Sequence, residues 1–168
     1  MQALDAPGRR DVTFIAIATM VIVAIALLST YNALPLRLDI GSSQSLPSVW
    51  HQIVAIAGLG IPMAVWFVKR NHPKIRPILS SYLMVLLAQI VSEIIMLQWF
   101  ARGMSVVIGT IYSAFRVIQL WHSQNCTTSE VKQFYWLRIG LWMLLIIWSI
   151  NLVQFLLFRW PDMLGIHD

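Results

Sequence analysis

The sequence predicts an all-α, polytopic integral membrane protein with about five transmembrane helices in a single domain, residues 1–168. Hydrophobic residues make up 58% of the chain and charged residues 11%, about half the charged fraction of an average soluble domain. Apolar runs of about 20 residues recur, and a helix of that length crosses the hydrocarbon core of a bilayer. Short segments rich in lysine and arginine separate these runs, as in loops that determine membrane topology.

The first predicted span covers residues 12–31. It follows two arginines, and we expect Asp11 to cap the start of its helix. A basic start followed by an apolar core is also typical of a signal peptide. The apolar run is long for that, and no clear cleavage site precedes a soluble domain, so a retained helix is favoured.

The second predicted span covers residues 48–68, which contain a proline near their middle. Pro62 has no amide hydrogen, so the carbonyl of Gly58, four residues earlier, loses its helical partner. We therefore expect a kink near mid-membrane in this span.

The remaining predicted spans cover residues 78–100, 104–121 and 134–158. Only residues 101–103 separate the third span from the fourth, and a connection that short predicts an antiparallel helical hairpin. Six of the eight tryptophans fall at the ends of predicted spans, where aromatic side chains gather at membrane interfaces.

The distribution of basic residues predicts the orientation. With the N-terminus inside, the inner segments hold eight lysines and arginines and the outer segments hold three, which favours N-in and C-out. One inner loop carries four of these cations, and we expect it to contact anionic lipid. Its basic residues are Lys69, Arg70, Lys74 and Arg76.

Several function classes lack support in the sequence. The net charge is +5, but the cations lie between apolar runs and no nucleic-acid-binding motif accompanies them. Cys126 is the only cysteine, so neither an intrachain disulfide nor a cysteine-based metal site is expected. The four histidines fall at different depths, which disfavours a metal or haem site. Common catalytic motifs are absent, no cofactor is indicated, and the chain leans towards a non-enzymatic role.

Glu93 and Arg116 are the two ionisable residues well inside the predicted spans. A charge in hydrocarbon costs about 2.5–3.5 kcal/mol on insertion scales, so each needs a partner, a water-filled cavity or a ligand. Helical rise places the two residues roughly 7–10 Å apart in depth on neighbouring helices, a gap that an arginine side chain can largely close.

Helical spacing adds polar neighbours to this pair on three spans. Polar side chains in lipid turn towards the bundle interior, so we expect one inner site with amides around the two charges. Aromatic walls are expected from Tyr112, Phe115, Trp142 and Trp148. The polar faces comprise Tyr82, Gln89, Ser92 and Glu93; Tyr112, Ser113, Arg116 and Gln119; and Ser149, Asn151 and Gln154. The candidate ligand-binding residues are Glu93, Arg116, Gln89, Tyr112, Ser113, Asn151 and Trp142.

Three roles remain open for these residues. Glu93 and Arg116 can lock the helices together as an ion pair, form part of a ligand or substrate site, or belong to a proton or ion path. Arg116 can also extend towards the inner surface without meeting Glu93.

The functional hypothesis is a non-enzymatic small integral membrane protein. It binds a hydrophobic ligand or serves as a subunit or assembly factor of a membrane complex, with other membrane proteins or its own copies as partners. The alternative is a small membrane enzyme or carrier for an amphipathic substrate, in which Glu93 exchanges a proton and Arg116 holds an anionic group.

Overall fold

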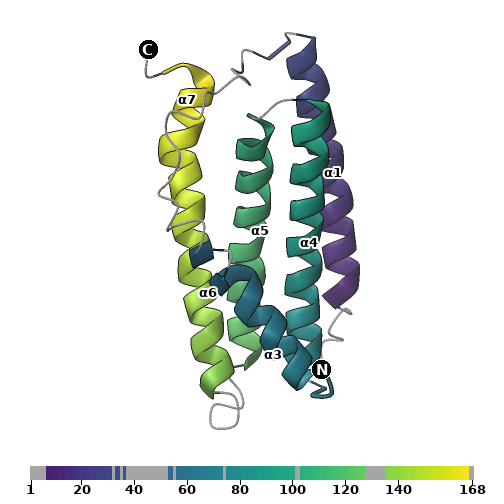
Figure 1. Ribbon diagram of the computed structural model, residues 1–168, viewed down its shortest axis with the longest axis vertical. Coiled ribbons are helices and arrows are strands. Elements are labelled where there is room, and N and C mark those ends of the chain that lie inside the picture. Colours follow the sequence, from purple (N-terminus) through teal and green to yellow (C-terminus); the bar gives the residue numbers. More distant parts are fainter. Residues whose placement is uncertain are drawn as a thin grey trace.

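All regular elements of the structure, a computed structural model, are helices. The structure describes residues 7–31, 33, 34, 36, 53, 54, 56–73, 75–100, 103–127 and 135–166. Four helical segments are long and apolar enough to cross a membrane, and they run along the long axis of the molecule (Figure 1). The predicted all-α membrane bundle is therefore confirmed.

Helix α1 covers Pro7–Thr30 and presents a narrow row of side chains to the bundle. Ala18, Ile22 and Ala26, four residues apart, are almost fully buried, while many large apolar side chains on its other faces are exposed. Asp11 lies one turn inside this helix, so its predicted role as N-cap is wrong. The helix begins earlier because Pro7 suits a first helical turn.

Within the second predicted span the structure describes a π-helical turn, η2 (Ile56–Gly60), followed by a helix, α3 (Ile61–Lys69). Together they are shorter than the roughly 20 residues that cross a bilayer. The π turn ends just before Pro62, so the distortion expected from this proline is present. Residues 48–52 and 55 lie outside the described residues, and the five-span count stays a prediction.

Helix α3 crosses obliquely over the lower half of the bundle in Figure 1. It is attached to the next helix by a hydrogen bond from Trp66 Nε1 to Ser80 Oγ, 2.8 Å long. Trp66 also packs edge-to-face against Phe67. The hydrogen bond of Trp66 therefore attaches α3 to α4.

Helices α4 (Ile75–Trp99) and α5 (Met104–Thr127) form the predicted antiparallel hairpin (Figure 1). Helix α4 begins three residues before its predicted start because Pro77 is tolerated within the first turn. Helix α5 extends past the predicted end at residue 121. The last helical segment comprises α6 (Tyr135–Gln154), the π turn η4 (Phe155–Arg159) and α7 (Trp160–Leu164).

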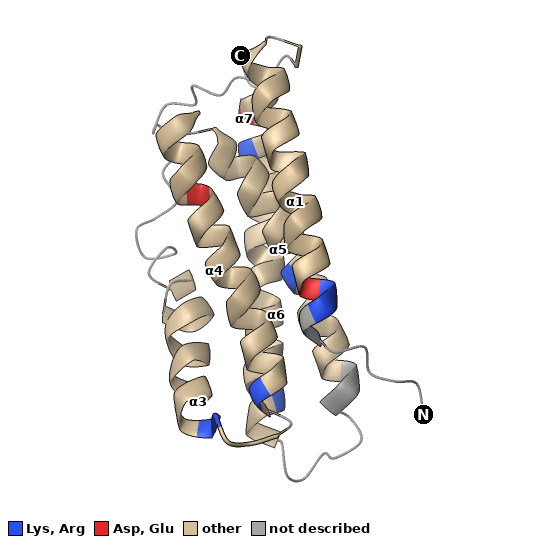
Figure 2. Ribbon diagram, turned by 90° about the vertical axis from the view of Figure 1, so that its right-hand side faces the viewer, with Lys and Arg blue, Asp and Glu red and all other residues tan. Residues whose placement is uncertain are grey.

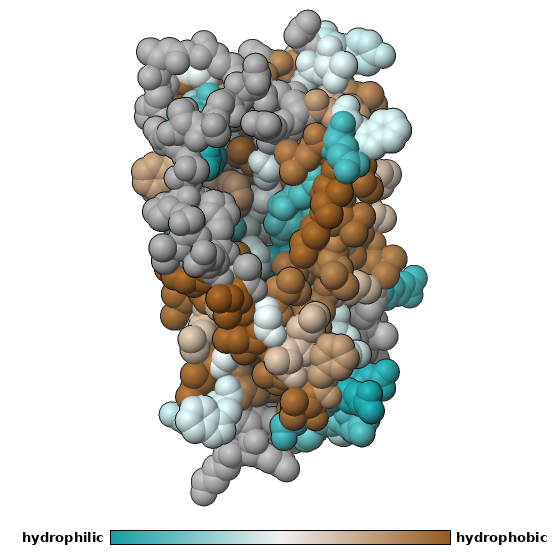
Figure 3. Space-filling model, viewed as in Figure 1, coloured by the Kyte–Doolittle hydropathy of each residue, from teal (hydrophilic) through white to brown (hydrophobic). Residues whose placement is uncertain are grey.

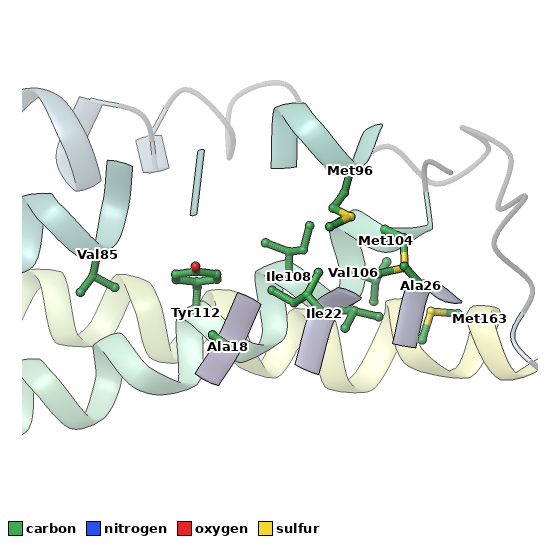
Figure 4. Close-up of a cluster of buried hydrophobic side chains, with 11 residues drawn as sticks. Ala18, Ile22, Ala26, Val85, Met96, Met104, Val106, Ile108, Tyr112 and Met163 are labelled. Atoms are coloured by element: carbon green, nitrogen blue, oxygen red, sulfur yellow. The ribbon is translucent and has the colours of Figure 1, made fainter. Parts of the chain in front are cut away.

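Helix α5 is the central element of the bundle, since it contacts α1, α4, α6 and η4. Half of the most apolar stretch of α5 is buried, a larger share than in any of the other three candidate spans. One hydrophobic cluster joins α5 to α1 and α4 and includes Ile22, Met96, Ile108 and Tyr112 (Figure 4). A charged residue in the middle of α5 is consequently enclosed by protein.

The described charged residues are concentrated towards the ends of the helices, and Figure 2 shows basic residues where α3 ends. On the face in Figure 3 the described surface is largely apolar, and hydrophilic residues interrupt it in the upper half. Of the predicted lipid-contacting cations, Lys69, Arg70 and Arg76 are exposed. Lys74 lies outside the described residues.

Candidate functional site

The Arg116 side chain is completely buried, with a relative exposure of 0%. Its guanidinium carbon lies 3.8 Å from the centroid of the Trp148 ring on α6 and 5.7 Å from that of Tyr82 on α4. A cation over the face of an aromatic ring is attracted by the ring quadrupole. Arg116, Trp148 and Tyr82 therefore form a cation–aromatic cluster at the junction of three helices, which we call the arginine cluster.

A chain of hydrogen bonds fixes the two rings of the arginine cluster. Trp148 Nε1 donates to the Tyr82 hydroxyl at 2.9 Å, and this hydroxyl donates to the Gly58 carbonyl at 2.6 Å. Gly58 has this carbonyl available because Pro62 cannot donate to it. The carbonyl that the sequence predicted to be freed in the second segment thus holds one wall of the site.

The guanidinium itself has no hydrogen-bond partner among the described residues. Nε, Nη1 and Nη2 of Arg116 are all buried and unpaired. Cation–aromatic contacts contribute up to about 2 kcal/mol when desolvated. A buried unsatisfied donor costs about 1–3 kcal/mol, and a guanidinium carries five N–H donors. The aromatic rings alone therefore leave the cation under-compensated.

Glu93 does not hydrogen-bond to Arg116. Its carboxylate instead accepts a 2.7 Å hydrogen bond from Gln89 Nε2, one turn earlier in α4. Gln89 is buried and Glu93 is half-buried. The helix lock that one sequence hypothesis placed between Glu93 and Arg116 is therefore not formed by a direct hydrogen bond.

The remaining polar residues predicted for the site are buried in neighbouring pairs. Asn151 Nδ2 on α6 donates to Ser113 Oγ on α5 at 3.0 Å, and both side chains are buried. The Tyr112 hydroxyl lies 3.4 Å from Ser92 Oγ of α4. The sequence-predicted polar faces thus do meet between α4, α5 and α6.

Two predicted aromatic walls lie elsewhere. Trp142 is 40% exposed and packs edge-to-face against Trp121, with 6.2 Å between centroids. It is therefore on the outer surface, because its position on α6 does not share a face with Trp148. Phe115 stacks on Phe14 of α1 at 3.6 Å, on the side of α5 that faces α1.

Sequence reasoning missed a second polar cluster, formed by Asp11, Ser81 and Gln119 at the end of the bundle where α1 begins. Ser81 Oγ donates to Asp11 Oδ2, and Gln119 Nε2 donates to Asp11 Oδ1 at 3.2 Å and to Ser81 Oγ at 2.7 Å. Asp11 is only 3% exposed. The sequence feature that could have predicted this cluster is the position of Asp11, directly ahead of an apolar run and at the depth of the polar residue Gln119 in the fourth predicted span.

These two clusters differ in what they can bind. The Asp11 cluster is internally hydrogen-bonded and links α1 to α4 and α5. In the arginine cluster the charged guanidinium donors have no hydrogen-bond partner among the described residues, whereas the unpaired atom of the Asp11 cluster is an acceptor, Gln119 Oε1. No group of three histidine, cysteine or acidic side chains that could hold a metal is present among the described residues.

Comparisons of the chain with protein-family models, with curated proteins and with solved structures found no match. The functional argument therefore rests on the geometry of the arginine cluster and the surrounding polar residues.

Proposed function

We propose that this protein is a non-enzymatic, multi-pass integral membrane protein that binds a small amphipathic molecule inside its helical bundle. Arg116 is the polar anchor of the bound molecule. The observation that carries this proposal is the completely buried guanidinium whose three nitrogens have no hydrogen-bond partner. A ligand with acceptor atoms supplies what the described protein atoms do not.

The surroundings of Arg116 support a molecule that is largely apolar. The hydrophobic cluster around Tyr82 and Trp148 includes leucines from α4, α5 and α6. Ligand sites are commonly lined by apolar side chains with a few polar groups that fix orientation. The buried leucines of the cluster around Tyr82 and Trp148 are Leu86, Leu120, Leu141, Leu144 and Leu145.

Native mass spectrometry of the protein extracted gently from its own membrane tests this function. The proposal predicts a small molecule that co-purifies with the wild-type chain and with Arg9→Met, a change at an exposed arginine. The same molecule is expected to be lost from folded Arg116→Met. Retention of the molecule by Arg116→Met would remove Arg116 as its anchor, and a bare wild-type protein would contradict the ligand-binding function.

Glu93 supports a second candidate function, a carrier or small enzyme for an amphipathic substrate. Its carboxylate is half-buried within α4 and is held by Gln89 rather than by Arg116, so it is placed to exchange a proton. Glu93→Gln in proteoliposomes tests this role. Loss of substrate transport or turnover, with folding and binding retained, would favour the carrier or enzyme over the simple binding protein.

We also propose that the exposed cations around the junction of α3 and α4 contact anionic lipid headgroups. Lys69, Arg70 and Arg76 lie at one end of the bundle, and a cation near an anionic surface gains about 1 kcal/mol. Replacing all three by glutamine is expected to reduce stabilisation by phosphatidylglycerol in nanodiscs, with no change in phosphatidylcholine. Equal effects in both lipids would contradict this contact.

A further inference from the structure

We propose that the molecule bound at Arg116 carries a single carboxylate on an apolar tail, and this inference rests on the ligand-binding function proposed above. The arginine cluster restricts how the cation can be approached. One face of the guanidinium is covered by Trp148 at 3.8 Å, so the N–H groups around its edge are the donors left for a ligand. A planar carboxylate matches this edge, since its two oxygens accept two parallel N–H bonds.

The charge around the cluster favours one negative charge over two. Among the residues that the structure describes, Arg116 is the only lysine or arginine in α5, and the acidic group that interacts with it electrostatically is Glu93 of α4. The unpaired amide oxygens Gln89 Oε1 and Gln154 Oε1 are acceptors and add no positive charge. A doubly charged phosphate monoester would leave part of its charge uncompensated in a site of low dielectric.

The side of the arginine cluster that η2 covers is the route by which we infer that a ligand enters. Gly58 lies against the arginine cluster so closely that a Cβ there would be 3.3 Å from Trp148 Cζ2 and 3.8 Å from the Tyr82 hydroxyl. This wall belongs to a π turn and a short helix, not to a continuous long helix. Such turns are frequent at functional sites, and this side of the cluster is the entry route that we infer for the ligand.

The test compares three probes of equal tail length: dodecanoate, dodecanol and dodecyl phosphate. Binding of each to the full chain in phosphatidylcholine nanodiscs is measured by calorimetry. A charge-assisted bidentate contact predicts that the wild-type protein binds dodecanoate at least about tenfold more tightly than dodecanol, and more tightly than dodecyl phosphate. Nanodiscs containing phosphatidylserine show whether a lipid-borne carboxylate competes for the same site as the free acid.

Arg116→Met is expected to lower dodecanoate affinity to that of dodecanol, while Arg9→Met keeps the wild-type preference. The comparison among probes uses the wild-type chain, so it stands even if Arg116→Met does not fold. Equal wild-type affinities for acid and alcohol would overturn the carboxylate inference and leave ligand binding intact. Tighter binding of dodecyl phosphate than of dodecanoate would show that the ligand's anionic group is not a carboxylate, and would overturn the inference. No binding of any probe would contradict the proposed ligand-binding function as well.

Discussion

At the scale of single residues, the two buried charged groups Asp11 and Arg116 differ in how they are hydrogen-bonded. Asp11 has both carboxylate oxygens hydrogen-bonded by its neighbours, whereas the three guanidinium nitrogens of Arg116 have no hydrogen-bond partner among the described residues. A buried polar group without a partner is destabilising, so its presence in an otherwise well-packed helix indicates a use beyond packing. The arginine cluster is therefore the site on which the functional account depends.

Trp148→Leu is expected to destabilise the protein by about 2–4 kcal/mol, because it removes a large buried ring and the cation–aromatic contact with Arg116. Trp142→Leu is the matched control on the same helix. Trp142 is 40% exposed, so its replacement is expected to change stability by less than about 1 kcal/mol. Thermal unfolding in detergent measures both. Equal losses would show that Trp148 has no special contact with the cation.

Asp11→Asn is expected to be nearly neutral, since an amide can replace much of the hydrogen bonding with Ser81 and Gln119. Asp11→Leu leaves those two side chains without their partner and is expected to cost about 1–3 kcal/mol. Thermal unfolding of the two variants separates a polar link from simple packing. A leucine variant as stable as wild type would contradict the link between α1 and the hairpin.

The sequence predicted which residues line the site, but it could not predict the directions in which their side chains extend. Lone charges in apolar runs identified Glu93 and Arg116, and helical periodicity brought Ser113 and Asn151 together as the structure has them. Periodicity does not fix a rotamer, so it could not decide that Arg116 extends to Trp148 and Tyr82 rather than to Glu93. It also could not separate buried Trp148 from exposed Trp142.

At the scale of elements, the least regular segment contributes to the site. Pro62 and the π turn before it free the Gly58 carbonyl, which Tyr82 then uses. The sequence predicted this distortion from the chemistry of proline. It could not predict the π turn itself or the contact of α3 with α4, because apolar composition alone does not fix helix type or packing partner.

Two glycines on neighbouring helices provide a test of helix packing. A Cβ at Gly109 of α5 would lie 2.3 Å from Phe155 Cζ, whereas one at Gly140 of α6 would meet nothing within 4 Å. Gly109→Ala is therefore expected to destabilise by about 1–3 kcal/mol through overpacking. Gly140→Ala is expected to stabilise by about 0.5–1 kcal/mol through helix propensity. The same sign for both variants in thermal unfolding would contradict the packing of α5 against η4.

At the scale of the whole molecule, α1 begins at the end of the bundle opposite to the end of α7 (Figure 1). Apolar composition and run length predicted the helical membrane bundle correctly because four long apolar segments are present. The orientation is not determined by packing, since it depends on the charges of the loops relative to the membrane.

Epitope tags at the two termini test the predicted orientation. The excess of basic residues in the inner segments predicts an N-terminal tag inside and a C-terminal tag outside. Protection from an impermeant protease in sealed vesicles of known sidedness measures each tag. Two tags on the same side would mean an even number of crossings, and η2 and α3 would then not form part of a complete span.

The central claim is that the Arg116 guanidinium takes a ligand carboxylate inside the bundle. Solid-state NMR can test it directly by measuring dipolar coupling between 15N-labelled arginine and dodecanoate labelled with 13C at its carboxyl carbon, in bilayers. The account predicts a coupling that corresponds to hydrogen-bonding distance and disappears in Arg116→Lys, which keeps the charge but has no labelled guanidinium. Bound dodecanoate with no such coupling in the wild-type protein, or with a coupling that survives in Arg116→Lys, would contradict the claim.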